Sequence, residues 1–206
     1  MQSRKVFELS GGRLCLDFIN TVEKRPTSLR CELLETYADL AAWSRQSGIL
    51  TAREEEAVVK RARKTPLRAA KTLERARLLR EALFALFSRG GDSGLQALRD
   101  ALPAAYRTPV LPSAPPYRLR WEDDPGALDR MLGSVVRSAV ELLTSEELDR
   151  VRVCGAGNWE WLFLDESKSR SRQWCDMAVC GNRAKARRFY QRKRGLKRRG
   201  SRASRR

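Results

Sequence analysis

The chain has 206 residues, of which 42% are hydrophobic, so it has room for one core of ordinary size and a small appended module. It carries 42 Lys and Arg against 25 Asp and Glu, a net charge of +17; residues 150–206 hold 18 of the basic and 4 of the acidic residues, and therefore +14 of that charge. No run approaches the roughly 18 apolar residues of a membrane span, and residues 1–10 lack the apolar core of a signal peptide, which argues against a membrane or secreted protein. Histidine is absent, so the usual general base of enzymes is missing.

The first predicted element lies within residues 7–22 and follows a Gly-Gly turn. Its apolar positions fit both a strand and one face of a helix, and we favour the helix. Asp17, Asn20 and Thr21 would then form a polar edge beside the apolar stripe. These side chains could line a ligand pocket, or they could cap or hydrogen-bond the loop that follows.

Helical periodicity and capping signals predict the rest of a helical domain over residues 1–149. The expected helices cover residues 31–47, about 52–63 after the capping residue Thr51, 66–89 as the central helix that begins at Pro66, 95–102, and a last one that begins at Pro125 after Asp123 or Asp124 as cap. A proline-rich irregular connector over 103–116 and a short strand over 117–121 separate the last two helices.

Three cysteines dominate the next segment. Residues 151–154 and 161–164 read as the strands of a hairpin, Cys154 ends the first strand, and Cys175 and Cys180 lie around a turn with four residues between them. We expect Cys180 at the start of a basic helix, with Gly181 and Asn182 as loop and cap residues, where the helix dipole favours a thiolate. In a reducing cytoplasm, where we place the protein, clustered cysteines bind metal more often than they form disulfides, so Cys154, Cys175 and Cys180 are candidate zinc ligands. The alternative is that they are buried small hydrophobic residues.

A fourth ligand is not evident in the sequence, because Trp159 occupies the position where a second cysteine would complete a C-x4-C pair. The remaining candidates are water, a nearby carboxylate, or a distant thiol, namely Glu160, Asp165, Asp176, Cys15 or Cys31. An open fourth position is also typical of catalytic zinc sites.

The run CGNR at residues 180–183, within WLFLDESKSRSRQWCDMAVCGNRAKARR, resembles the CGNR zinc finger. The segments GGRLCLDFINTV, ETYADLAAWSRQSGIL and RARLLREALFALF resemble the ABATE domain, which precedes this finger in bacterial proteins described as candidate regulators of stress-induced transcription. The resemblance implies a helical domain of unsettled role and a zinc-binding, DNA-binding module. The family's cysteines correspond to Cys154, Cys175 and Cys180, and its remaining cysteine falls at Trp159.

We therefore expect a mainly α protein: a helical ABATE-like domain over 1–149, a small treble-clef-like zinc finger of a β-hairpin and a helix over 150–194, and a disordered basic tail over 195–206. The tail contains six basic residues and a single leucine.

Basic residues of the module are the candidate nucleic-acid contacts. They are Arg183, Lys185, Arg187, Arg188 and Arg192 on the helix and Lys168, Arg170 and Arg172 in the preceding turn. Asn182 and Arg183 could also read base edges if the helix start enters the major groove. The alternatives are that Asn182 caps the helix, that Arg183 braces the fold, and that the turn is a solvated loop.

The sequence thus favours a DNA-binding transcriptional regulator whose N-terminal domain senses a small molecule or a partner. A protein that binds RNA, or nucleic acid without sequence preference, is the alternative. An enzyme is the least supported reading, because residues 1–149 contain no carboxylates or cysteines at catalytic spacing. We therefore expect that the protein is not an enzyme.

Overall fold

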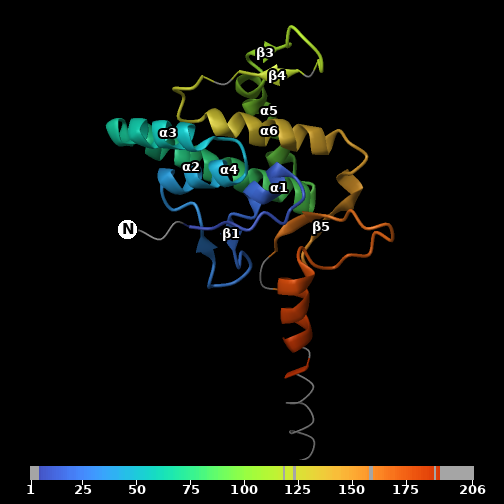
Figure 1. Cartoon of the computed structure of the whole chain (residues 1–206). Helices are drawn as coiled ribbons and strands as arrows, with labels where there is room; N and C mark the ends of the chain where they lie inside the picture. The colour runs from blue at the N-terminus through green and yellow to red at the C-terminus, as the bar shows by residue number, and fades with distance from the viewer. Residues whose placement is uncertain (1–4, 118, 123, 158–159, 188, 191–206) are drawn as a thin grey trace, which may run out of the picture.

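The computed structural model describes residues 5–117, 119–122, 124–157, 160–187 and 189–190. Within these residues the chain is mainly helical, and the helices of the body are α1 (Leu14–Ile19), α2 (Tyr37–Gln46), α3 (Ala52–Lys64), α4 (Pro66–Arg89), α5 (Asp92–Ala105) and α6 (Arg130–Leu143) (Figure 1). No helix in this part of the chain combines the length and the hydrophobicity that a membrane crossing requires. The predicted tail over 195–206 lies outside the described residues.

The strands form three separate two-stranded antiparallel pairs among the described residues. These are β1 (Val22–Glu23) with β2 (Cys31–Glu32), β3 (Pro109–Val110) with β4 (Arg120–Trp121), and β5 (Val151–Val153) with β6 (Leu162–Leu164). A 3-10 turn, η1 (Leu148–Arg150), leads into β5, and a π-helical turn, η2 (Met177–Gly181), opens the C-terminal helix. The predicted hairpin is confirmed, and Arg152 pairs with Phe163 at its centre.

Capping boxes set the starts of α2 and α3. The Thr51 side chain accepts a hydrogen bond from the N–H of Glu54, whose carboxylate in turn accepts one from the N–H of Thr51, as the sequence predicted. The same reciprocal pair joins Thr36 and Asp39, so α2 begins at Tyr37 and the expected start at residue 31 is wrong. The residues ahead of Thr36 instead contribute β2.

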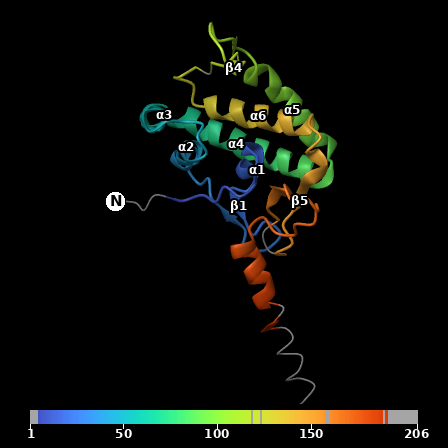
Figure 2. The same ribbon diagram turned by 45° about the vertical axis from the view of Figure 1, so that its right-hand side comes forward.

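Helix α4 is the central element, as predicted. Pro66 opens it, and Gly90 ends it in the left-handed conformation (φ 68°) that glycine adopts without strain. Its buried face includes Leu73, Ala76 and Leu83, and it packs against α1, α2, α3 and α5. The views in Figures 1 and 2 both place α4 in the middle of the body.

The segment before α6 departs from the prediction. The carboxylate of Asp124 accepts a hydrogen bond from the N–H of Gly126 (2.7 Å), and the Asp124 carbonyl accepts one from Ala127 (2.9 Å). These bonds close a turn, so the helix begins at Arg130 and not at Pro125. Helix α5 is longer than expected at both ends, and it includes Pro103 from the predicted connector.

A buried arginine ties the β1–β2 pair to α4. Arg80 is 1% exposed, and its guanidinium forms a two-point ion pair with Glu32 in which both N–O distances are 2.6 Å. The same guanidinium donates to the hydroxyl of Thr21 (3.2 Å), and this hydroxyl donates to the carbonyl of Phe18. A two-point pair of this kind satisfies the charge of a cation that burial would otherwise destabilise.

The β5–β6 hairpin belongs to the core of the helical body. Leu162 and Leu164 are buried in the same cluster as the apolar residues of α1, α4 and α6. The indole N–H of Trp161 donates to the carbonyl of Val22 (2.9 Å), and the N–H of Leu164 donates to the carbonyl of Gly11 (2.8 Å). The C-terminal module is therefore anchored to the body through its hairpin.

Candidate metal centre and basic helix

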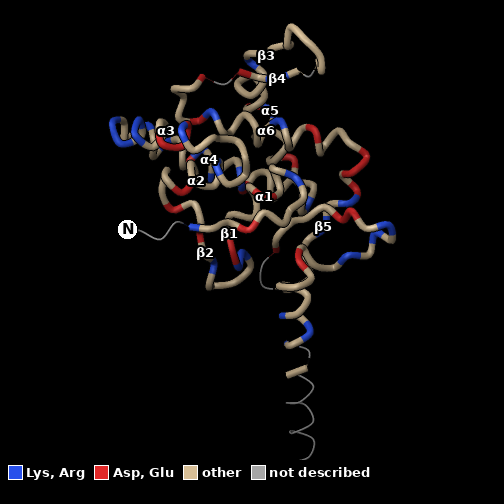
Figure 3. The backbone as a smooth tube through the Cα atoms, viewed as in Figure 1, with Lys and Arg blue, Asp and Glu red and all other residues tan. Residues whose placement is uncertain are grey.

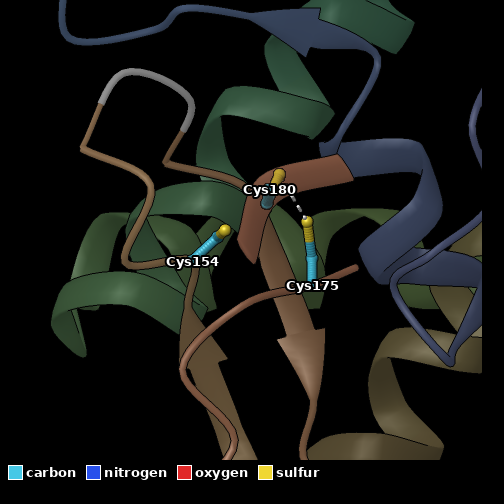
Figure 4. A group of neighbouring side chains, drawn as sticks. All are labelled: Cys154, Cys175 and Cys180. Carbon is cyan, nitrogen blue, oxygen red and sulfur yellow. Dashed lines mark hydrogen bonds between the residues drawn. The ribbon is translucent and has the colours of Figure 1, made fainter. Parts of the chain in front are cut away.

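Three buried cysteines from separate segments converge at the turn end of the β5–β6 hairpin. Cys154 follows β5, Cys175 ends the long loop after β6, and Cys180 lies in η2; Figure 4 shows their sulfur atoms pointing toward one another. All three Sγ atoms lie within 4.8 Å of one another, and those of Cys175 and Cys180 are 3.5 Å apart. Tetrahedral Zn–S bonds of about 2.3 Å place sulfur atoms about 3.8 Å apart, which falls inside this range.

Backbone hydrogen bonds place Cys154 at the turn of the hairpin. Its N–H donates to the carbonyl of Trp161 (2.8 Å), and the N–H of Gly155 donates across the site to the carbonyl of Gln173 (2.8 Å). The chain then turns at Gly157, which has a φ of 77°. The loop that carries Cys175 is thus held directly against the strand that carries Cys154.

Asp165 organises the loop between β6 and Cys175. One of its carboxylate oxygens accepts the N–H (2.9 Å) and the hydroxyl (2.5 Å) of Ser167, and the other accepts the N–H of Arg172 (2.9 Å). The pKa of this carboxyl is lowered, and the hydrogen bonds from Ser167 are the largest cause. Because both oxygens are used inside the loop, Asp165 has a structural role.

Arg172 braces the same loop. Its guanidinium donates to the carbonyls of Trp174 (2.8 Å) and Cys175, and its Cζ lies 5.0 Å from the centre of the Phe163 ring. These bonds orient the backbone at Cys175. They also occupy the guanidinium of Arg172, which the sequence had suggested as a phosphate contact.

The basic helix starts earlier than predicted. Asp176 is the capping residue, and its carboxylate accepts the N–H of Val179 (2.7 Å). Its carbonyl accepts the N–H groups of both Cys180 (3.0 Å) and Gly181 (3.1 Å), and the second of these bonds, which spans five residues, gives the turn its π-helical form. Cys180 and Gly181 are therefore inside the first turn, and the expectation that the helix begins there is wrong.

Asn182 is also inside the helix (φ −67°, ψ −40°), so it does not cap the helix start. Its side-chain amide donates to the carbonyl of Ala178 (2.9 Å), one turn earlier. A Cβ at Gly181 would lie 2.5 Å from the sulfur of Met177, so this exposed side chain would have to move to admit one. Asn182 of the CGNR run thus has a helix-bracing role.

The three thiols have different acidities. A hydrogen bond from the Cys175 thiol, with backbone N–H donors of Cys175 and Ala156, holds the pKa of Cys154 at about 5. The Cys175 thiol donates its proton to Cys154 in this hydrogen bond, and this raises the pKa of Cys175. Burial raises the pKa of Cys180 to about 11. A cation would stabilise all three thiolates together, and sulfur donors of this kind suit zinc and not magnesium or calcium.

The suggested fourth ligands from the sequence do not join this cluster in the part of the chain that the structure describes. The Asp165 and Asp176 carboxylates have the loop and capping roles given above. Cys15 is buried in the core of the helical body, and Cys31 is exposed on β2. Trp159 lies outside the described residues.

The C-terminal helix projects away from the body, and Lys and Arg residues lie along it (Figures 2 and 3). Residues 182–187 and 189–190 are helical, and Arg183, Lys185 and Arg187 are exposed. Arg187 also donates to the carbonyl of Ala156 (3.1 Å), which holds the helix against the turn after Cys154. The suggested contacts Arg188 and Arg192 lie outside the described residues.

The turn after β6 gives a second cationic surface. Lys168 and Arg170 are exposed there, whereas the guanidinium of Arg172 is used as described above. The sequence reasoning overlooked two exposed aromatic residues, Phe189 and Tyr190, which are 62% and 65% exposed. The signal that could have found them is an adjacent aromatic pair inside a run of cations.

The predicted polar edge, with Asp17 in α1 and Asn20 and Thr21 directly after it, has internal partners. The Asn20 amide bonds to the backbone of Leu162, Thr21 bonds to Arg80 and Phe18, and the carboxylate of Asp17 accepts the N–H of Gly11 (2.8 Å). A cavity of about 770 Å³ lies elsewhere, between α4, α5 and α6. The alternative in which these side chains hydrogen-bond neighbouring segments therefore has direct support.

Two family models match the chain. The ABATE model, whose description reads "Putative stress-induced transcription regulator", matches residues 12–146. The CGNR zinc finger model matches residues 150–193. No curated protein shows significant sequence similarity to the chain.

Proposed function

The chain belongs to the ABATE family, whose model covers most of its length, and we propose that it is a DNA-binding transcriptional regulator and not an enzyme. The observation that carries this proposal is the cluster of three buried thiols at the base of an exposed cationic helix. A metal-binding cluster in this position fixes the helix to the body. The helix can then present its charges as a rigid surface.

We propose one zinc ion as the metal, held by Cys154, Cys175 and Cys180. When bound, it would supply a structural cross-link between the hairpin turn, the loop and the helix. The module has a small core of its own, formed by the three cysteines with Ala156, Trp161 and Phe163, and such small units commonly need a metal to fold. Water would complete the coordination.

Charge distribution supports nucleic acid as the partner. Residues 150–206 carry +14 of the net charge, and phosphate contacts from Arg183 and Lys185 would supply affinity and orientation without reading sequence. Base reading would come from the exposed side of the same helix. Lys168 and Arg170 form a second phosphate contact in this proposal.

A second candidate function is RNA or single-strand binding. It is favoured by Phe189 and Tyr190, whose rings are 5.8 Å apart in an edge-to-face arrangement and exposed beside the cations. Exposed aromatic rings stack on unpaired bases, and this stacking is tolerant of sequence.

Selection of bound fragments from genomic DNA by the full chain, at physiological salt and with zinc present, tests the proposal. A regulator should enrich a limited set of duplex fragments that share a sequence. Uniform recovery of all fragments, together with equal or tighter binding of single-stranded RNA in a parallel titration, would support the second candidate and contradict the first.

A further inference from the structure

The helical body contains a cavity of about 770 Å³ between α4, α5 and α6, within the size range of small-molecule sites. Helix α5 packs against both α4 and α6, and it faces the cavity with Ala97, Ala101 and Ala104, which lie on one side of the helix. Their short side chains leave the space open. Leu79 and Val136 supply further apolar surface from α4 and α6.

A second groove of about 390 Å³ adjoins this cavity and has a different chemistry. It is lined by Arg61, Arg68 and Lys71, and no ion pair with an acidic side chain is present for any of the three within the described residues. Three cations facing one groove without a carboxylate partner attract an anion. The hydroxyl-bearing residues Thr65 and Thr72 add hydrogen-bonding groups to the same groove.

The cavity and the groove share a wall. Arg75, Asp124, Ala127 and Asp129 line both of them. The two acidic side chains of this wall have partners, because Asp129 pairs with Arg75 (3.1 Å) and Asp124 accepts the N–H of Gly126. Only the Asp129 charge is offset by a cation, so the groove keeps the three cations Arg61, Arg68 and Lys71 against one carboxylate, that of Asp124. The continuous surface passes from alanine and leucine side chains to a groove with an excess of positive charge.

We propose that this composite site binds a small amphiphilic anion, with its apolar body in the cavity between α4, α5 and α6 and a phosphate or carboxylate head in the groove at Arg61, Arg68 and Lys71. The exposed Leu78, at the rim of the cavity, would be covered by the apolar body (63% exposed without it). A regulatory use of the site rests on the function proposed above. Binding itself does not, so the test measures it without nucleic acid.

Octyl phosphate, titrated into the full chain below its micelle concentration, is the probe, and isothermal calorimetry is the measurement. Octanoate tests the carboxylate head, octyltrimethylammonium reverses the charge, and inorganic phosphate removes the apolar body. We expect saturable one-to-one binding of an octyl anion that is at least about tenfold tighter than that of the cation or of phosphate alone.

The double variant Arg68→Glu and Lys71→Glu should weaken this binding by at least about tenfold, because it replaces two attractive charges with two repulsive ones. These side chains are exposed, so the helices should remain intact by circular dichroism. The matched control, Arg89→Glu with Arg99→Glu, makes the same charge change on α4 and α5 away from the site and should leave the affinity within about twofold. Ala101→Phe fills the cavity and should weaken octyl phosphate binding while leaving the cationic groove intact.

The proposal would be overturned by no saturable binding of either octyl anion, by equal affinity for octyltrimethylammonium, or by equal loss in the two charge-reversal variants. Loss of binding only in a C-terminal Arg183→Glu and Lys185→Glu variant would place the anion on the basic helix and would also overturn it. Failure of DNA binding would leave these measurements unaffected, so the two proposals are tested separately.

Discussion

Asn20, directly after α1, and Leu162 of β6 form a buried two-point hydrogen bond that joins the helical body to the hairpin of the C-terminal module. The Asn20 amide donates to the Leu162 carbonyl (2.8 Å), and its oxygen accepts the Leu162 N–H (2.9 Å). Asn20 is 2% exposed and Leu162 is fully buried. The side-chain amide of Asn20 pairs with the backbone of Leu162 in the way that the backbone of a neighbouring strand would.

Replacement of this asparagine should be costly. Asn20→Ala leaves a buried donor and a buried acceptor of Leu162 without partners, so we expect a loss of about 2 to 4 kcal/mol in the free energy of unfolding. Urea denaturation followed by circular dichroism measures it. Asn182→Ala is the control, because Asn182 makes one exposed side-chain bond, and it should cost less than about 1 kcal/mol. Equal effects of the two substitutions would show that the Asn20 bond contributes little.

Removal of one thiol should remove the metal. Cys175→Ser replaces a candidate ligand at the centre of the cluster, and we expect bound zinc to fall from one ion per chain to less than about a tenth of that after dialysis. Mass spectrometry of the metal content measures this, and Cys31→Ser, an exposed cysteine outside the cluster, should retain a full ion. Circular dichroism should show that most of the helical body persists. A full zinc equivalent in the Cys175→Ser protein would contradict the site.

The pH dependence of stability should reveal Asp17. Burial raises the pKa of this carboxyl from 3.8 to about 6, with the hydrogen bond from Gly11 acting in the opposite direction. Between these two values the folded state holds the proton more tightly than the unfolded state does. The contribution of Asp17 to stability is therefore lost as the pH rises from about 4 to about 6, and its charge opposes folding at pH 7.

Asp17→Asn keeps an oxygen that can accept the Gly11 N–H and removes this charge. We expect the variant to be more stable than the natural protein by about 1 to 3 kcal/mol at pH 7 and equally stable at pH 4. Urea denaturation at both pH values checks the difference. Glu56→Gln, at an exposed position of α3, should show no such change with pH. A gain of the same size for Asp17→Asn at both pH values would exclude the protonation explanation.

Local signals in the sequence predicted the helices well where a cap or a proline fixes their start. Thr51 with Glu54 and Pro66 are such signals, and α3 and α4 begin where they indicate. The predicted starts of α2 and α6 are wrong because local hydrogen bonds around Thr36 and Asp124 compete with helix formation there. Apolar periodicity does not report such competition.

The candidate metal site was recognisable from the spacing of its cysteines and from the CGNR run, and the structure brings Cys154, Cys175 and Cys180 together. The five-residue bond from Gly181 to Asp176, which moves the helix start, has no signature in residue type. The partners of Asn20 and the cavity between α4, α5 and α6 depend on segments far apart in the chain. A single sequence carries no direct information about such contacts.

The central claim is that the C-terminal helix carries the contacts with DNA, and the salt dependence of duplex binding tests it most directly. Fluorescence anisotropy should be measured over a series of salt concentrations for the natural protein, for Arg183→Ala with Lys185→Ala, and for Arg89→Ala with Arg99→Ala as the charge-matched control. Each lost phosphate contact lowers the slope of log K against log salt concentration by about 0.9, so the helix variant should lose about 2 in slope and the control almost nothing. An unchanged slope in the Arg183 and Lys185 variant, or an equal loss in the control, would contradict the assignment of this helix to DNA.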